Sequence, residues 1–336
     1  MDSSHWLYHL LSIYLSITTT ISKSILFFLS HLKRFPFIVT ILDPLLSILY
    51  HFYGLSPCTV DLDDQTTMHY WTAKHRRFNR PSLVLIHGYG STSKWQFYRQ
   101  VGQLSRAFNV YLPELLFFGE SYTSREERTE VFQARCVCEG LKRLGVEKFS
   151  VYAISYGGWV GYRMAEMYPE MVEKVVIVSS GVGLTEEQKG EHLGKLGMDV
   201  RDLLCPEKPE HLRSLVDLTM YKSKFGTWVP DFFLREYIRV MCMKYRKERI
   251  ELVEYLMAKK ADSDQLPVLT QETLLIWGDQ DKVFPPYLAY QLQRHLGSKS
   301  KVEIIEETGH AATIEAADAL NDLIMSFVLS SPKLAA

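Results

Sequence analysis

Residues 149–167 read FSVYAISYGGWVGYRMAEM and contain the turn that decides the fold. The apolar run Phe149–Tyr152 predicts a buried strand. After the turn, the segment Trp159–Met167 predicts a helix, which Pro169 ends. The stretch therefore reads as a strand, a sharp turn and a helix, with Ser155 on the turn.

Small residues flank this serine. A serine on such a turn is held in a strained backbone conformation, and its neighbours must be small because the strand and the helix pass close together. Ala153, Gly157 and Gly158 meet that need. The turn also leaves the backbone amide of Tyr156 at the helix N-terminus, where it can bind an oxyanion formed when Ser155 attacks a carbonyl. Taken alone, the motif also fits a turn that only lets a helix pack on a sheet.

The turn resembles the nucleophile motif of the α/β-hydrolase superfamily, G-x-S-x-G, with Ala153 in place of the first glycine. The resemblance extends to His87-Gly88-Tyr89-Gly90, which directly follows the predicted strand Leu83–Ile86. Superfamily members place the loop with the second oxyanion donor here. The resemblance assigns that donor to the backbone amide of Tyr89, with His87 and Gly88 as supporting residues of the motif.

Two further motifs complete the superfamily's order along the chain. Residues 274–285, LLIWGDQDKVFP, resemble the acid loop, in which the later aspartate is catalytic; this implies Asp281, and Asp279 is expected to form the turn. His310 follows the predicted strand Lys301–Ile305, where the superfamily places the catalytic histidine. The order Ser, Asp, His differs from that of chymotrypsin and subtilisin, and the resemblance therefore implies a triad of Ser155, Asp281 and His310.

The rest of the chain from Thr59 alternates strand-like runs with helical stretches, which is typical of a mostly parallel sheet covered on both faces. Seven strands are predicted: Thr67–Trp71, Ser82–Ile86, Asn109–Leu112, Phe149–Ile154, Lys174–Ser179, Thr273–Trp277 and Lys301–Ile305. The resemblance implies an α/β-hydrolase fold with an eight-stranded sheet. We expect its core to comprise residues 58–183 and 269–333.

Between Ser179 and Thr273, about 90 residues lack a convincing strand, far more than a connecting loop needs. We therefore expect residues 184–268 to form a helical lid, with helices over Asp199–Leu204, Pro209–Tyr221 and Pro230–Ala258. The lid is rich in aromatic and methionine side chains, which either line an acyl pocket or fill the lid's own core. They are Met220, Tyr221, Phe225, Trp228, Phe232, Phe233, Tyr237, Met241 and Met243.

Residues 1–57 form a distinct apolar segment that is predicted to be helical. Read as a helix, residues 5–23 carry a narrow polar stripe on an otherwise apolar surface. The stripe consists of His5, His9, Ser12, Ser16, Thr19 and Lys23. Three interpretations stay open for residues 5–53: packing on the catalytic domain, attachment to a membrane surface, or a transmembrane span. The start of the chain lacks the features of a secretory signal, so we expect an intracellular protein at the cytoplasmic face.

Composition excludes several classes of function. A formal net charge of -1 gives no electrostatic footprint for nucleic acid. The sequence shows neither a metal-ligand cluster nor a dinucleotide fingerprint, so we predict no metal and no cofactor. Five cysteines without a framework spacing favour reduced thiols. Histidines other than His310, such as His192, His211 and His295, are interpreted as surface or structural residues.

These features predict a serine hydrolase that cleaves the carboxylic ester of a small hydrophobic or lipid-like molecule through an acyl-enzyme. One alternative is carbon–carbon bond hydrolysis, because the loop Trp277–Pro285 also resembles that of ring-cleavage-product hydrolases; those usually have Gly-Pro-Gly where this chain has Ser91-Thr92-Ser93. Another is a ligand receptor on the same fold. The segment Leu112–Ser121 looks closest to uncharacterised plant members with apolar N-termini. Many of these have Asp in place of Glu114, so we assign Glu114 no catalytic role.

Overall fold

The computed structural model describes residues 19–20, 22–23, 37–222, 229–260 and 266–330. Most of the predicted N-terminal polar stripe, from His5 to Ser16, lies outside these residues, as do Phe225 and Trp228 of the predicted lid set. Among the described residues, no helix combines the length and the apolar character that crossing a membrane requires.

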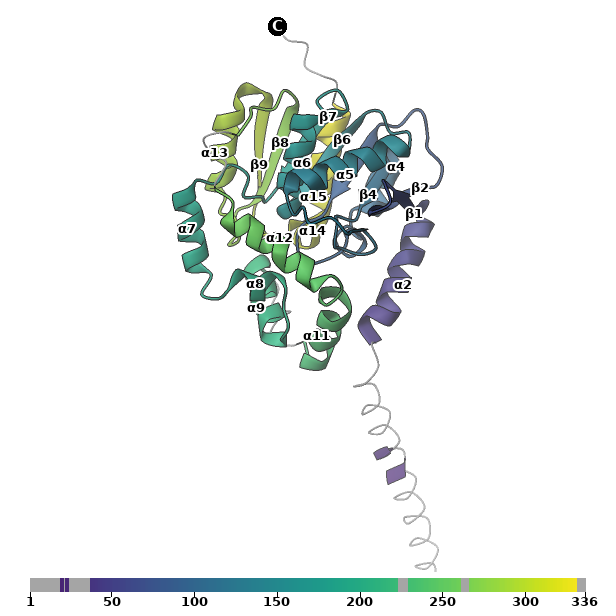
Figure 1. Ribbon diagram of the computed structural model, residues 1–336, viewed down its shortest axis with the longest axis vertical. Helices are drawn as coiled ribbons and strands as arrows, with labels where there is room; N and C mark the ends of the chain where they lie inside the picture. Colours follow the sequence, from purple (N-terminus) through teal and green to yellow (C-terminus); the bar gives the residue numbers. More distant parts are fainter. Residues whose placement is uncertain (1–18, 21, 24–36, 223–228, 261–265, 331–336) are drawn as a thin grey trace, which may run out of the picture.

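The described residues form one sheet of nine strands (Figure 1). Eight of them lie in the order β1-β2-β4-β3-β6-β7-β8-β9, and β5 pairs with β2. The strands from β4 to β9 along this order pair in parallel, whereas β2 pairs antiparallel with β1, β4 and β5. Their bounds are β1 Leu55–Asp61, β2 Thr66–Ala73, β3 Ser82–Ile86, β4 Asn109–Pro113, β5 Tyr122–Thr123, β6 Phe149–Ile154, β7 Val172–Val178, β8 Glu272–Gly278 and β9 Ser300–Ile305. This sheet confirms the predicted fold class, although it has nine strands and not the expected eight, because the short β5 also pairs with β2.

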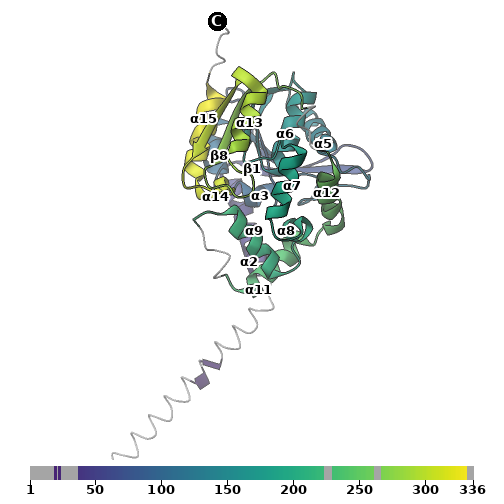
Figure 2. The ribbon, with the colours of Figure 1, turned by 90° about the vertical axis from the view of Figure 1, so that its left-hand side faces the viewer.

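Helices cover both faces of the sheet (Figures 1 and 2). Val151 and Ala153 of β6 belong to the hydrophobic cluster on one face, and Tyr152 and Ile154 belong to the cluster on the other face. Burial on both faces explains why the central strands read as continuous apolar runs. The first cluster is completed by α5 Glu130–Arg143, α6 Tyr156–Met167 and α13 Tyr287–Leu296, and the second by α4 Val101–Ala107 and α15 Ala317–Leu329.

Two strands were not predicted from the sequence: the two-residue β5 and the first strand, β1. β1 begins at Leu55, before the expected boundary between residues 57 and 58, and pairs with β2 along its whole length. It lies at the sheet edge and contains Pro57, a residue that edge strands tolerate. The helix α2, Phe37–Phe52, leads directly into it.

The described residues between β7 and β8 contain helices and no strand. They lie at one end of the sheet in both views (Figures 1 and 2). We call this part the helical insertion. Its helices are α7 Glu186–Lys195, α8 Val200–Leu204, α9 Pro209–Thr219, α11 Asp231–Tyr237, the π-helix η1 Ile238–Cys242, and α12 Arg246–Ala258. The predicted single helix over Pro230–Ala258 is wrong, because Tyr245 takes a left-handed conformation with φ 54° and separates η1 from α12.

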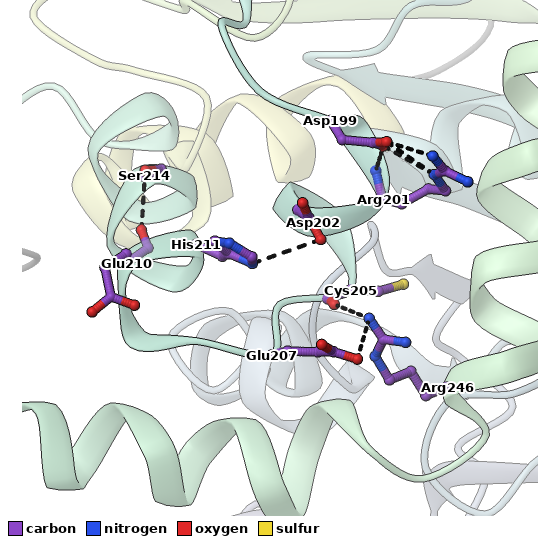
Figure 3. A network of polar contacts seen from close by, with 9 residues as sticks. All are labelled: Asp199, Arg201, Asp202, Cys205, Glu207, Glu210, His211, Ser214 and Arg246. Carbon is purple, nitrogen blue, oxygen red and sulfur yellow. Dashed lines mark hydrogen bonds and ion pairs between the residues drawn. The ribbon is translucent and has the colours of Figure 1, made fainter.

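Polar contacts join the helices of the insertion (Figure 3). Arg246, at the start of α12, donates a hydrogen bond to the carbonyl of Cys205 at 3.2 Å and pairs with Glu207 at 3.0 Å. His211 of α9 lies 3.8 Å from the carboxylate of Asp202 in α8. These contacts hold the turn after α8 against α9 and α12.

Candidate functional site

Ser155 stands directly after β6, at the first residue beyond the strand. Its backbone has φ 56° and ψ -123°, a conformation that residues with a side chain rarely adopt. The amide of Ser155 donates to the carbonyl of Val178 at 2.9 Å, and Ser180 donates its hydroxyl to the carbonyl of Ser155 at 2.8 Å. The turn is therefore held from the neighbouring strand β7.

The small residues predicted around this serine are required by close packing. A Cβ atom on Gly157 would lie 2.5 Å from the carbonyl oxygen of His87 and 2.6 Å from that of Ile86. Gly88 is equally constrained, because a Cβ there would lie 2.9 Å from the Cβ of Ser155. The turn and the His87-Gly88 loop thus fit together only because both carry glycine.

Ala153 replaces the first glycine of the motif, and the opposing helix accommodates its methyl group. A Cβ atom on Gly161 of α6 would lie 2.7 Å from the Cβ of Ala153. The glycine that the motif lacks on the strand is thus present on the helix. Gly158, the third small residue predicted at the turn, faces the side chain of Ser180 in the same way.

The structure brings Ser155, His310 and Asp281 together. The Nε2 atom of His310 lies 3.0 Å from the hydroxyl of Ser155, and its Nδ1 atom lies 3.0 Å from the Oδ2 atom of Asp281. The other carboxylate oxygen of Asp281 accepts hydrogen bonds from the amides of Val283 and Phe284, at 2.8 and 2.9 Å. A buried carboxylate can only accept from the ring, so Nδ1 carries the proton and Nε2 is free to accept the serine proton.

Asp279 has a different partner from the one expected. Its carboxylate accepts a hydrogen bond from the amide of Thr308 at 3.1 Å and another from the side chain of Gln280 at 3.1 Å. Thr308 lies two residues before His310, so Asp279 ties the acid loop to the histidine loop. This contact fixes the distance between Asp281 and His310.

His87 fixes the loop that carries Tyr89. Its Nε2 atom accepts a hydrogen bond from the amide of Leu115 at 2.9 Å, and its Nδ1 atom donates to the carbonyl of Gly88 at 2.7 Å. The side chain is fully buried, and burial lowers its pKa to about 4. The ring is therefore neutral at pH 7 and serves as a rigid link between the ends of β3 and β4. Gln96 completes the link by accepting from the amide of Gly88 at 2.6 Å.

The amides of Tyr156 and Tyr89 lie on the two loops that meet at Ser155. Tyr156 is the first residue of α6, so its amide has no intrahelical acceptor. Within the described part of the chain, the amide of Tyr89 donates no hydrogen bond either. The side chain of Tyr89 reaches the helical insertion, where its hydroxyl donates to the carbonyl of Arg249 at 2.5 Å and lies 3.5 Å from the sulfur of Cys205. This connection between loop and insertion was not visible in the sequence.

A cavity of about 160 Å³ opens beside Ser155, between the core and the helical insertion. Leucines are the most frequent residues of its wall on the insertion side, among them Leu193, Leu196, Leu203, Leu204, Leu218 and Leu256. From the predicted aromatic and methionine set, Phe233, Tyr237 and Met241 pack instead into the insertion's own core, around Leu212 and Leu234. The sequence left these two roles open, and for these three residues the structure favours the second.

His192 lies in this cavity, which corrects its interpretation as a surface or structural residue. It belongs to α7, and its ring stacks on Phe284 with a centroid distance of 5.6 Å. Phe284 in turn lies 5.6 Å from the ring of His310. Burial lowers the pKa of His192, so its ring is a neutral polar group on a wall that also contains Lys189, Lys259 and Lys260.

No group of three or more metal-ligating side chains occurs among the described residues. Glu114, which follows β4, is a buried carboxylic acid outside the Ser155 cavity. Its Oε1 atom accepts from the hydroxyl of Ser93 at 2.8 Å, while burial raises the pKa of Glu114 to about 7.

Comparison with known proteins places this site in a family. The model of the Alpha/beta hydrolase family matches residues 83–323. The chain is 29% identical over 258 residues to a 2-hydroxy-6-oxononadienedioate/2-hydroxy-6-oxononatrienedioate hydrolase of a Pseudomonas species, covering 73% of this chain and 87% of that protein. It is 26% identical to Lipase 1 of Psychrobacter immobilis, covering 73% and 76%.

A solved structure of a bacterial membrane phospholipase A superimposes with a TM-score of 0.73 at 21% identity, covering 94% of this chain and 96% of that one. At this identity the likeness shows the shared fold alone. The resemblance to plant members stays a prediction.

Substituting Gly157 tests the packing at the turn. We expect Gly157→Ala to lower the free energy of unfolding by roughly 1–3 kcal/mol, because the methyl group meets two backbone oxygens that cannot move freely. Gly190→Ala in α7 is a matched control, because a Cβ there meets nothing within 4 Å and helix propensity favours alanine. Chemical denaturation of both variants measures the difference, and an equal effect of the two would contradict the packing model.

Glu114→Gln tests the raised pKa of this carboxyl group. Between about pH 4.5 and pH 7 the folded protein holds a proton on Glu114 that the unfolded chain has released, so this group destabilises the fold as pH rises. His87 contributes with the opposite sign, because its folded pKa is lowered, but it is present in both proteins. Relative to wild type, the free energy of unfolding of Glu114→Gln should rise by roughly 2–3 kcal/mol across this window. Denaturation curves measured at several pH values would refute the assignment if the difference were constant.

Proposed function

This chain belongs to the alpha/beta hydrolase family, and from that premise we propose that it is a serine hydrolase that cleaves carboxylic esters. The observation that carries the proposal is the chain of hydrogen bonds from Asp281 through His310 to Ser155. The Nδ1 and Nε2 atoms of His310 each lie 3.0 Å from their partner oxygen. A hydroxyl in this setting is an activated nucleophile. The 26% identical Lipase 1 supports an ester as substrate.

In the proposed reaction, the Oγ atom of Ser155 attacks the ester carbonyl carbon while Nε2 of His310 takes the hydroxyl proton. The carbonyl oxygen becomes an oxyanion, which the amides of Tyr89 and Tyr156 bind. His310 then gives the proton to the leaving alcohol as the carbon–oxygen bond breaks. Water, deprotonated by the same histidine, hydrolyses the acyl-enzyme and releases the acid. Asp281 holds the ring orientation and stabilises the imidazolium throughout.

We further propose that the acyl group of the substrate is a hydrophobic chain. The leucine wall of the cavity beside Ser155 supports this, because apolar lining lowers the free energy of an alkyl group transferred from water. In this role the helical insertion acts as the lid that was expected from the sequence. His192, whose ring stacks on Phe284, lines the same wall and is suited to contact a polar atom of the ester.

Hydrolysis of a carbon–carbon bond is a second candidate, since the 29% identical relative is a hydrolase of an oxo-dienedioate. The loop after Tyr89 favours ester cleavage, because Ser91-Thr92-Ser93 stands where the ring-cleavage hydrolases have Gly-Pro-Gly. A third candidate is a receptor on the same fold, which would keep its ligand bound after a single turnover and would not release products repeatedly. Assays of an ester and of a vinylogous diketo acid, followed over many turnovers, separate the three functions.

Ser155→Ala tests the nucleophile. We expect its ester hydrolysis to fall at least about 10³-fold, because no other hydroxyl replaces the attacking oxygen. Ser298→Ala, in the exposed 3-10 helix η2 Gly297–Lys299 and outside the cavity lining, should hydrolyse esters at the wild-type rate. Both rates are measured with a chromogenic ester after thermal denaturation confirms folding. Retained activity in Ser155→Ala would exclude this serine as the nucleophile.

The acyl-chain preference tests the cavity. Each added methylene that enters it gains about 0.8 kcal/mol, which corresponds to about a fourfold rise in kcat/KM until the roughly 160 Å³ are filled. Leu196→Trp should shift the preferred ester to a shorter chain, because the larger ring occupies part of that space. A series of esters that differ only in acyl length provides the measurement. Wild-type rates that do not depend on acyl length would contradict a hydrophobic acyl pocket.

A further inference from the structure

The helix α2 carries an apolar face that no described part of the chain covers. Five large apolar side chains lie exposed on it, with Ile48 and Phe52 exposed by 63% and 81%. They are Ile41, Leu42, Leu45, Ile48 and Phe52. Their spacing along the helix places them on one side, while Tyr50 on the opposite side is fully buried against the core. In Figure 1, α2 lies along the flank of the molecule.

The polar groups of α2 are turned away from this face. Asp43 accepts hydrogen bonds from Lys94 at 2.7 Å and from the indole of Trp95 at 2.8 Å. Ser47 also accepts from Lys94, at 2.8 Å, and Tyr50 donates to the carbonyl of Lys94 at 3.0 Å. The helix is thus anchored to α3, Ser93–Gln96, by its polar side, which leaves the apolar side directed outward.

Charge along the chain favours a particular occupant for this face. Asp43 is the only acidic residue between positions 3 and 52, and its carboxylate is neutralised by Lys94. The same stretch contains the basic residues Lys23, Lys33 and Arg34. In sequence, the stretch that carries this apolar face thus has an excess of basic over acidic residues, a composition that favours binding to an anionic membrane.

We propose that α2 docks with its apolar face on an anionic lipid surface. The helix lies parallel to the membrane, with Leu45 and Ile48 near the centre of the contact and the anchored polar side toward the protein. This proposal does not depend on the ester chemistry, because binding to lipid is measured without substrate.

The test uses the full chain with Leu45→Glu and Ile48→Glu combined. Two charges on the face remove its apolar contact and repel anionic headgroups, so the partition coefficient onto phosphatidylcholine–phosphatidylserine vesicles should fall at least about tenfold. The matched control combines Val268→Glu and Leu329→Glu, which replace apolar residues of similar exposure, 58% and 52%, outside α2. The control should bind vesicles within about twofold of wild type. Thermal denaturation verifies that all three proteins are folded.

Three results would overturn the proposal. The first is no vesicle binding by the wild-type chain. The second is equal binding by wild type and by the variant with Leu45→Glu and Ile48→Glu, which would assign any lipid contact to residues other than the α2 face. The third is loss of self-association in that variant, measured by light scattering, without a change in vesicle binding, which would make a second copy of the chain the occupant.

Discussion

The backbone conformation of Ser155 is the constraint on which the site depends. A φ of 56° is unfavourable for serine, and the surrounding contacts must compensate for it. β6 is paired in parallel on both edges, by β3 and β7, and the carbonyl of Val178 accepts from the Ser155 amide. On the other side, Gly157 lets α6 approach the end of β3 so closely that only a hydrogen atom fits in place of a side chain. The hydroxyl group is therefore directed out of the sheet, toward His310.

The other parts of the site reach Ser155 because parallel strands end at the same edge. The loops after β8 and β9 carry Asp281 and His310, and the bond from Thr308 to Asp279 joins those loops to each other. The loop after β3 carries Tyr89, whose hydroxyl is bonded to Arg249 in the helical insertion. Any displacement of the insertion would therefore act on the Tyr89 loop as well as on the cavity wall. The Ser155 site and the substrate-facing cavity are coupled through this side chain.

Features that depend on a few consecutive residues could be predicted from the sequence. Features that depend on packing between segments far apart in the chain could not. The central strands are buried on two faces and read as apolar runs, and the resemblance of the Ser155 turn and the acid loop rests on a few consecutive residues. β1 was missed because it is an edge strand with Pro57 and half-buried side chains. The break at Tyr245 and the position of His192 in the cavity follow from how the insertion packs, which no short pattern encodes. The leucines of the cavity wall come from four helices, α7, α8, α9 and α12, and the residues that join them.

The central claim is that Ser155 is the activated nucleophile, and a covalent probe tests it most directly. A fluorophosphonate reacts with a serine only when a neighbouring base removes the hydroxyl proton and the oxyanion is stabilised. Incubation of the folded chain with this probe, followed by proteolysis and mass spectrometry, locates the adduct. We predict a single adduct on the peptide that contains Ser155, lost on heat denaturation before labelling. An unlabelled folded chain, or an adduct on a different residue, would contradict the claim.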